Sequence, residues 1–174
     1  NTRGQWGRII QNKEVLWLAS WDCPITGKAK YVYPGQASEQ RGLKDKAKYE
    51  LARKLKKNIK KIRDSYNFRA KSENLFDRQL STAVYFIDQF ALRVGNEKNQ
   101  DEADTVGVTS LRKEHLHLMP NLQIKLDFLG KDSIRFHKIL DIHKDYYDNI
   151  LEFTKTKNND EQIFDLVQSK HINE

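Results

Sequence analysis

A regular spacing of apolar residues inside strongly basic sequence is the feature that most constrains this chain. Between Arg41 and Lys71 there are thirteen Lys and Arg but three acidic residues, a local charge of +10 in a chain whose net charge is +7. Apolar side chains recur there at alternating three- and four-residue steps: Ala52, Leu55, Ile59, Ile62 and Tyr66. This spacing predicts one long amphipathic helix whose outer face is basic.

The basic face of this helix indicates a polyanionic partner. A cluster of Lys and Arg in a chain of pI 9.4 is the electrostatic footprint of nucleic-acid binding, and Lys56 and Lys57 are candidate DNA contacts within it. Composition alone leaves three other interpretations open: a face that is merely solvated, a membrane-surface helix and a calmodulin target.

The first 34 residues have the pattern of β-structure. Val15–Trp21 and Lys30–Tyr33 are short apolar and aromatic runs, and Asp22–Gly27 between them contains turn-forming residues. We therefore expect a β-hairpin. Tryptophan in a small hairpin is more often a core residue than a platform for base stacking, so we expect packing roles for Trp6, Trp17 and Trp21.

The middle of the chain predicts a buried helix followed by a small sheet. After a loop at Gly35–Gly42 and the basic helix, Ser72–Leu75 can cap a second helix, which is apolar almost all round after Ala83. Its end is expected at Val94, because Gly95 supplies a helix stop. The strands expected after it are Val106–Leu111, Glu114–Leu118, Leu122–Phe128, which alternates clearly, and Ser133–His137.

The C-terminal part is expected to be helical. Apolar spacing predicts a helix over Ile139–Phe153, a capped loop at Lys155–Asp160 and a further helix from Ile163. The predicted fold class is α+β: a mostly helical body with a small antiparallel sheet, preceded by a hairpin-bearing N-terminal lobe. We place the lobe at residues 1–38, contiguous with an upstream clamp region, and a catalytic-core subdomain truncated at its C-terminus at 39–174.

Composition excludes several classes of protein. No apolar run could span a bilayer and no secretion signal is present, so we expect a soluble, intracellular chain without a membrane partner. The lone Cys23 excludes an internal disulfide and any multi-cysteine metal site. His115 and His117 are expected on one face of a strand, but no third ligand stands nearby in sequence, so we expect no metal.

Two cationic residues suit phosphoryl transfer. Arg93 is expected near a helix end and Lys131 at a tight turn between strands. A guanidinium can clamp the charge on a phosphoryl group in transfer, and a lysine can donate a proton to the leaving group. Without further motifs the simpler interpretation is an arginine beside a helix C-terminus and a solvated turn lysine.

Several separated motifs, all in the same order, closely resemble the central core of the eukaryotic DNA topoisomerase I family, the type IB enzymes. The first reads Tyr85-Phe-Ile-Asp-x-x-Ala-Leu-Arg-x-Gly-Asn-Glu-Lys98. The other blocks are Trp17–Trp21, Lys48–Lys57, Ala103–Gly107, Ser110–His115 and Asp127–Arg135. Such a series is far more specific than a single glycine motif.

The resemblance implies a mechanism that needs neither metal nor ATP. In type IB enzymes a tyrosine attacks a DNA phosphodiester, forms a 3′-phosphotyrosyl link and is displaced again after the 5′ end has swivelled, which relaxes supercoils. Arg93 matches the first catalytic arginine, which stabilises the phosphorane, and Lys131 matches the lysine general acid. The implied partner is double-stranded DNA, and the implied location is the nucleus.

The resemblance also implies binding roles for neighbouring residues. Asn96, Lys98 and Thr105 match positions that contact DNA or its phosphate, and Asp132 matches a position beside the cleavage site where camptothecin-like inhibitors bind.

Three catalytic positions of the family are missing from this sequence: the second arginine, the histidine and the nucleophilic tyrosine. We therefore expect an excised core fragment that is inactive without the remainder of the parent polypeptide. The alternatives kept open are a tyrosine recombinase core, a non-catalytic basic DNA-binding scaffold, and a protein-interaction module that binds acidic partners.

Overall fold

The computed structural model describes residues 6–12, 15–35, 37–95 and 105–173, which form parts of two compact units, residues 1–58 and 59–174. The α+β fold class is confirmed, with helices and two small antiparallel sheets. Within the described ranges, no helix is long and apolar enough to cross a membrane.

The first unit contains the predicted β-hairpin. Strands β1 (Ala19–Asp22) and β2 (Ala29–Val32) pair antiparallel, and Cys23 N–H donates to the Lys28 carbonyl at 3.0 Å where the turn begins. The hairpin prediction is confirmed, although β1 is shorter than expected. The predicted packing of Trp6 and Trp21 is wrong, because they are 52% and 51% exposed.

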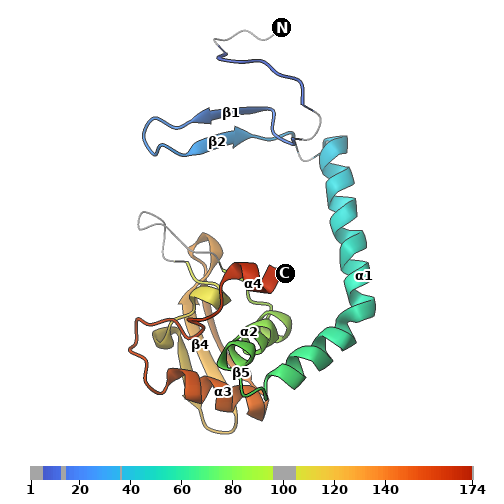
Figure 1. Ribbon diagram of the computed structural model, residues 1–174. Helices are drawn as coiled ribbons and strands as arrows, with labels where there is room; N and C mark the ends of the chain where they lie inside the picture. Colours follow the sequence, from blue (N-terminus) through green and yellow to red (C-terminus); the bar gives the residue numbers. More distant parts are fainter. Residues whose placement is uncertain (1–5, 13–14, 36, 96–104, 174) are drawn as a thin grey trace. The chain divides into compact units, whose positions relative to one another are not determined.

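A single long helix, α1 (Glu39–Arg69), follows the hairpin, as the apolar spacing predicts (Figure 1). It begins inside the expected loop, so the loop prediction is wrong from Glu39 onward. The side chains described over 43–58 are exposed. From Ile59 the apolar face of α1 enters the second unit, where Tyr66 is buried in the core.

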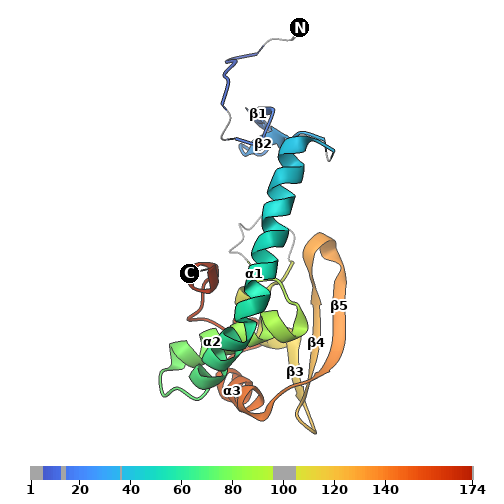
Figure 2. The same ribbon diagram turned by 90° about the vertical axis from the view of Figure 1, so that its right-hand side faces the viewer.

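The second unit is a three-stranded antiparallel sheet with helices on one face (Figure 2). The strand order is β3 (Leu116–Met119), β4 (Gln123–Leu129), β5 (Arg135–Asp141). The predicted alternation is confirmed, since Ile124, Leu126 and Phe128 of β4 all face the core. Helices α2 (Leu75–Phe90) and α3 (Lys144–Thr154) cover that face.

Helix α2 ends earlier than the sequence predicts. It starts at the N-cap Asn74, whose Oδ1 accepts the Phe76 N–H at 2.9 Å. It stops at Phe90 because Ala91 takes the left-handed conformation, with φ of 53°. The prediction that the helix runs to Val94 is therefore wrong. Arg93 is near the helix end, as expected, but lies three residues beyond Phe90, in a segment without regular secondary structure.

The segment predicted as strand Val106–Leu111 is not a strand, and it contains a short 3₁₀ helix, η1 (Val108–Ser110). A second one, η2 (Lys113–His115), contains a buried histidine whose Nδ1 accepts the Arg112 N–H at 3.1 Å. His117 lies in β3 and is exposed, so the prediction that the two histidines share a face is wrong. In the described part, no three His, Cys, Asp or Glu are placed to hold a metal ion.

The C-terminal helices also differ from prediction. Residues 139–141 belong to β5, and α3 starts only after the N-cap His143. Ile163 and Phe164 are fully buried but not helical, and the last helix, α4 (Ser169–Asn173), is short. These two side chains are therefore buried from a turn and not from a helix.

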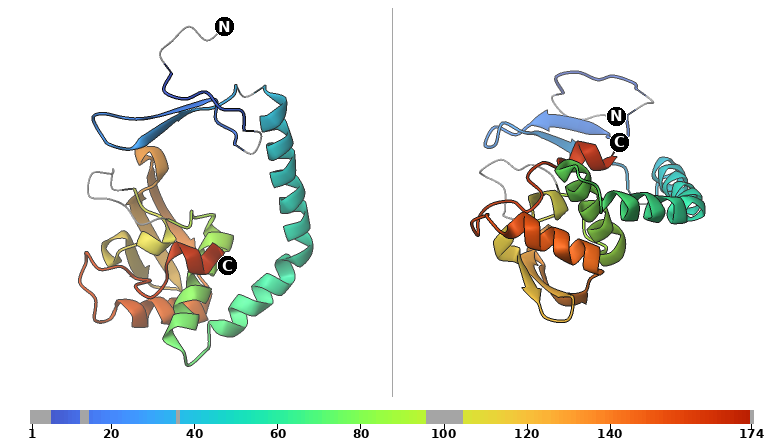
Figure 3. Two further views of the ribbon diagram at one scale, coloured as in Figure 1. Left: turned by 45° about the horizontal axis from the view of Figure 1, so that its top comes forward. Right: turned by 60° about the horizontal axis from the view of Figure 1, so that its bottom comes forward.

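The end of α1 lies beside α2 and α3 (Figure 3), and a polar and aromatic cluster attaches it to these helices. The Arg63 guanidinium donates to both carboxylate oxygens of Asp88 in α2, at 2.8 and 3.1 Å, and the Tyr66 hydroxyl donates to the same carboxylate at 2.7 Å. Tyr85 stacks on Tyr146 with ring centroids 3.8 Å apart. These contacts fix the last turns of α1 against α2 and α3.

Candidate phosphoryl-transfer site

The segment Thr105–Thr109 lies between the residues after α2 and strand β4, and it bonds to both. Val108 N–H donates to the Arg93 carbonyl at 2.8 Å, and Val106 N–H donates to the Leu129 carbonyl at 2.7 Å. We call this segment the strap. Because backbone bonds leave little freedom, the strap fixes the backbone of Arg93 relative to the end of β4.

Two glycines make this arrangement possible. A Cβ added to Gly107 would lie 2.3 Å from the Gly95 Cα and 3.0 Å from the Arg93 carbonyl oxygen. Gly95 itself has φ of +90°, a conformation that side chains other than glycine rarely adopt. The sequence predicted that Gly95 would end the helix, and this prediction is wrong. Gly95 is instead a point of close contact with the strap.

Lys131 lies at the tip of the β4–β5 hairpin, where it is exposed to solvent. Gly130 N–H donates to the Ile134 carbonyl at 2.8 Å and closes the turn. Inside it, Asp132 and Ser133 have φ of 62° and 57°. The prediction that Lys131 lies at a tight turn between two strands is confirmed, with β5 running on to Asp141.

Arg93, Lys131 and Asp132 line one cleft of about 260 Å³, with Phe128 and Phe136 among the other lining residues. Arg93 and Lys131 are both exposed. Neither side chain forms an ion pair with any residue that the structure describes. Two cations without a described ion-pair partner therefore line one cleft, and such an arrangement can bind a phosphodiester.

A third cation at the cleft, Arg135, is already paired. Its Nε and one terminal nitrogen donate to the two carboxylate oxygens of Asp127, at 2.8 and 2.7 Å. This fork of hydrogen bonds lowers the pKa of Asp127 to about 2 and raises the pKa of Arg135. The pair stays charged at neutral pH, so among the described residues that line the cleft, Arg93 and Lys131 are the cations without an ion-pair partner.

The other predicted binding residues are placed only in part. Thr105, half-buried, begins the strap. Asn96 and Lys98 lie outside the described residues. Lys56 and Lys57 are exposed on α1, within the first unit.

Sequence reasoning missed the residues that hold the site together. These are Gly107 in its contact with Gly95, and the pair of Asp127 with Arg135. The pair of Asp127 with Arg135 has a sequence signal, because opposite charges four residues before and after Lys131 come within diagonal reach of each other when the turn closes.

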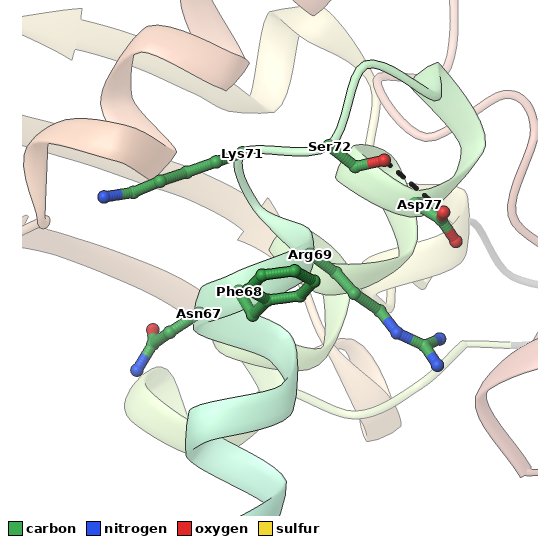
Figure 4. A pocket seen from close by; sticks show the side chains of 6 residues that line it. All are labelled: Asn67, Phe68, Arg69, Lys71, Ser72 and Asp77. Atoms are coloured by element: carbon green, nitrogen blue, oxygen red, sulfur yellow. Dashed lines mark hydrogen bonds between the residues drawn. The ribbon is translucent and has the colours of Figure 1, made fainter.

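A larger hollow, of about 690 Å³, lies where α1 passes into α2 (Figure 4). Phe68, 83% exposed, lines it together with Arg69, Lys71 and Asp77. Lys71 pairs with Asp145 at 3.2 Å. None of the predicted catalytic residues lies there, so size alone does not identify the site.

Fold and cleft define an α+β protein with a cationic site suited to a phosphodiester. The family profile described as eukaryotic DNA topoisomerase I, catalytic core, matches residues 37–174. The chain therefore belongs to the eukaryotic DNA topoisomerase I family, which confirms the resemblance of its motifs.

Curated relatives agree along nearly the whole chain. DNA topoisomerase 1 of Candida albicans is 44% identical over 97% of this chain, and those of Drosophila melanogaster and Homo sapiens are each 41% identical, over 98% and 97% of it. The chain spans only 18% to 23% of the length of these three relatives.

Proposed function

We propose that this chain is part of a nuclear type IB DNA topoisomerase, which relaxes supercoils by transient cleavage of one strand through a 3′-phosphotyrosyl intermediate. The observation that carries the proposal is the placement of Arg93 and Lys131 on one cleft. Family membership supports the activity, since the relatives are named DNA topoisomerase 1.

The two cations have different roles in this proposal. A tyrosine oxygen attacks phosphorus, the bond to the 5′-oxygen breaks, and Lys131 gives a proton to that oxygen. Arg93 donates hydrogen bonds to the non-bridging oxygens, where negative charge accumulates in the phosphorane. The minor groove offers acceptors at every base pair, so a lysine on a hairpin tip can be placed there with little sequence preference.

The attacking tyrosine is proposed to come from another part of a longer polypeptide. No tyrosine is among the described residues that line the cleft. Tyr66, Tyr85 and Tyr146 are packed together in the core, where burial raises the pKa of each phenol. Tyr147 donates its hydroxyl proton to the Met119 carbonyl. The short span relative to the known enzymes supports the same proposal, and this chain alone is expected to cleave nothing.

The proposed substrate is double-stranded DNA. The exposed basic face of α1, with Lys56 and Lys57, is proposed to contact phosphates. Asp132, beside Lys131 on the cleft, is the proposed contact for camptothecin-like inhibitors in the complete enzyme.

The proposal is tested by supercoil relaxation with the complete enzyme. Arg93→Ala is expected to lower the rate about 10²- to 10³-fold, the effect of removing one oxyanion donor, with little change in DNA affinity. Lys155→Ala is the control, because Lys155 is an exposed cation that follows α3 and is not among the residues that line the cleft. A near-normal rate for Arg93→Ala would make this arginine structural.

A further inference from the structure

The position of Lys131 depends on the stalk of the β4–β5 hairpin. Lys131 sits in a turn beyond the last strand pair, Leu129 with Arg135, and the residues from Lys131 to Ile134 are all exposed. Because no described side chain forms an ion pair with Lys131, its place over the cleft is set by the strand pairs just below it.

Those strand pairs are braced differently on the two faces of the hairpin. On the core side Phe128 and Phe136, directly opposite in register, stack with ring centroids 5.2 Å apart. On the other side Arg135 reaches diagonally across to Asp127 with two hydrogen bonds. A stack alone permits sliding of the rings, whereas a two-point fork between planar groups adds a directional link between the two strands near the tip.

The Asp127–Arg135 pair contributes little to global stability, because the Arg135 side chain is 66% exposed and solvent-exposed ion pairs are weak. Its effect is local. Arg135 follows Ile134, whose carbonyl closes the turn, and it also lines the cleft. Without Asp127 its guanidinium would be free to turn toward a bound phosphate.

We propose that Asp127 and Arg135 are positioning residues for Lys131: their paired side chains hold the hairpin tip so that the lysine ammonium reaches the leaving oxygen. This inference rests on the proposed function. Neither residue touches the reacting atoms in this account, and both act through Lys131. A displacement of about 1 Å at a reacting group can cost about 10²-fold in rate.

The test uses single-turnover cleavage by the complete enzyme on two DNA substrates, one ordinary and one with a 5′-bridging sulfur, which leaves without a proton. Asp127→Asn and Arg135→Gln are each expected to slow cleavage of ordinary DNA about 10- to 100-fold. Both should regain a near-normal rate on the sulfur substrate. The charge-swapped variant, Asp127→Arg with Arg135→Asp, should recover part of the lost rate on ordinary DNA.

Asp141→Asn is the matched control. Asp141 accepts a hydrogen bond from Gln123 at 2.9 Å across the same two strands, at the end of the sheet away from the tip. Its rate should be unchanged on both substrates. Melting temperatures of all variants should stay close to that of the parent.

Several results would overturn the inference. One is an equal slowing of Asp127→Asn on both substrates, which would mean general distortion of the cleft. Another is an additive effect of Asp127→Asn in a Lys131→Ala background, since a residue that acts through Lys131 has no effect once Lys131 is gone. If the sulfur substrate does not restore cleavage by Lys131→Ala, the proposed role of Lys131 as general acid is wrong. If it does restore it, but Asp127→Asn cleaves ordinary DNA at the normal rate, only the inference about Asp127 and Arg135 is wrong.

Discussion

Arg93 and Lys131 lie 38 positions apart in the chain, and backbone hydrogen bonds of a third segment, the strap, connect the regions that carry them. Val108 bonds to the carbonyl of Arg93, and Val106 bonds to that of Leu129, two residues before Lys131. Two cations from separate parts of the fold thereby share one cleft. Their relative position depends on the strap's approach to the segment after α2.

Gly107→Ala should disrupt that approach. The added Cβ would meet backbone atoms of Gly95, which cannot move aside as a flexible side chain can. We expect a loss of about 1 to 3 kcal/mol in stability, typical of overpacking, and a large loss of relaxation activity in the complete enzyme. Chemical denaturation and a relaxation assay measure the two effects.

Gly42→Ala is the control for this substitution. Gly42 lies in α1, where an added Cβ meets nothing within 4 Å, so alanine should be neutral or stabilise by up to about 1 kcal/mol. Equal behaviour of the two variants would contradict the role given to the strap.

DNA binding by the chain should be weak, of low sequence preference and strongly dependent on salt. If the basic face of α1 contacts phosphates, log affinity falls linearly with log salt, by about 0.9 for each contact neutralised. The double variant Lys56→Gln, Lys57→Gln should lower that slope by roughly 1.8. Fluorescence anisotropy across a salt series gives the slope, and affinity that ignores salt would exclude a phosphate-binding role.

Stability should decline at alkaline pH because of the buried tyrosines. Burial raises the pKa of Tyr66 to about 12, and those of Tyr85 and Tyr146 are also raised. In the unfolded chain the phenols lose their protons near pH 10, before they do in the folded chain. The free energy of unfolding therefore keeps its full value below pH 10 and falls as the pH rises toward 12. Each unit of difference in pKa corresponds to about 1.4 kcal/mol.

Urea denaturation between pH 8 and pH 11.5 measures this decline. Tyr66→Phe should flatten part of it, because that variant has one fewer buried phenol to ionise, at the cost of the hydrogen bond to Asp88. A free energy of unfolding that stays constant over this range would show that the buried phenols ionise without unfolding.

The periodic spacing of apolar residues predicted those helices and strands that bury only one face. Strand β4 follows its apolar spacing closely, because it buries a single face. Helix α1 forms where its spacing predicts, but only Ile59, Ile62 and Tyr66 of the predicted face are shielded from solvent. Ala52 and Leu55 of the same face are exposed. The end of α2 was misplaced because Ala91, not a glycine, takes the left-handed conformation. Ile163 and Phe164 are buried by tertiary contacts that no local period reports.

The candidate site was predictable as residues but not as geometry. Motif resemblance pointed to Arg93 and Lys131, and a turn at Lys131 follows from Gly130 and Asp132. The strap could not be predicted, since it depends on contact between glycines twelve positions apart and on an irregular segment expected to be a strand.

The most direct test of the assigned roles compares Lys131→Ala and Arg93→Ala in the complete enzyme on ordinary DNA and on DNA with a 5′-bridging sulfur. If Lys131 protonates the 5′-oxygen, its variant is severely slow on ordinary DNA and nearly restored by sulfur, which needs no proton to leave. Arg93→Ala should gain much less, because its proposed task is to stabilise charge on the non-bridging oxygens. Equal rescue of both variants, or rescue of neither, would contradict the account.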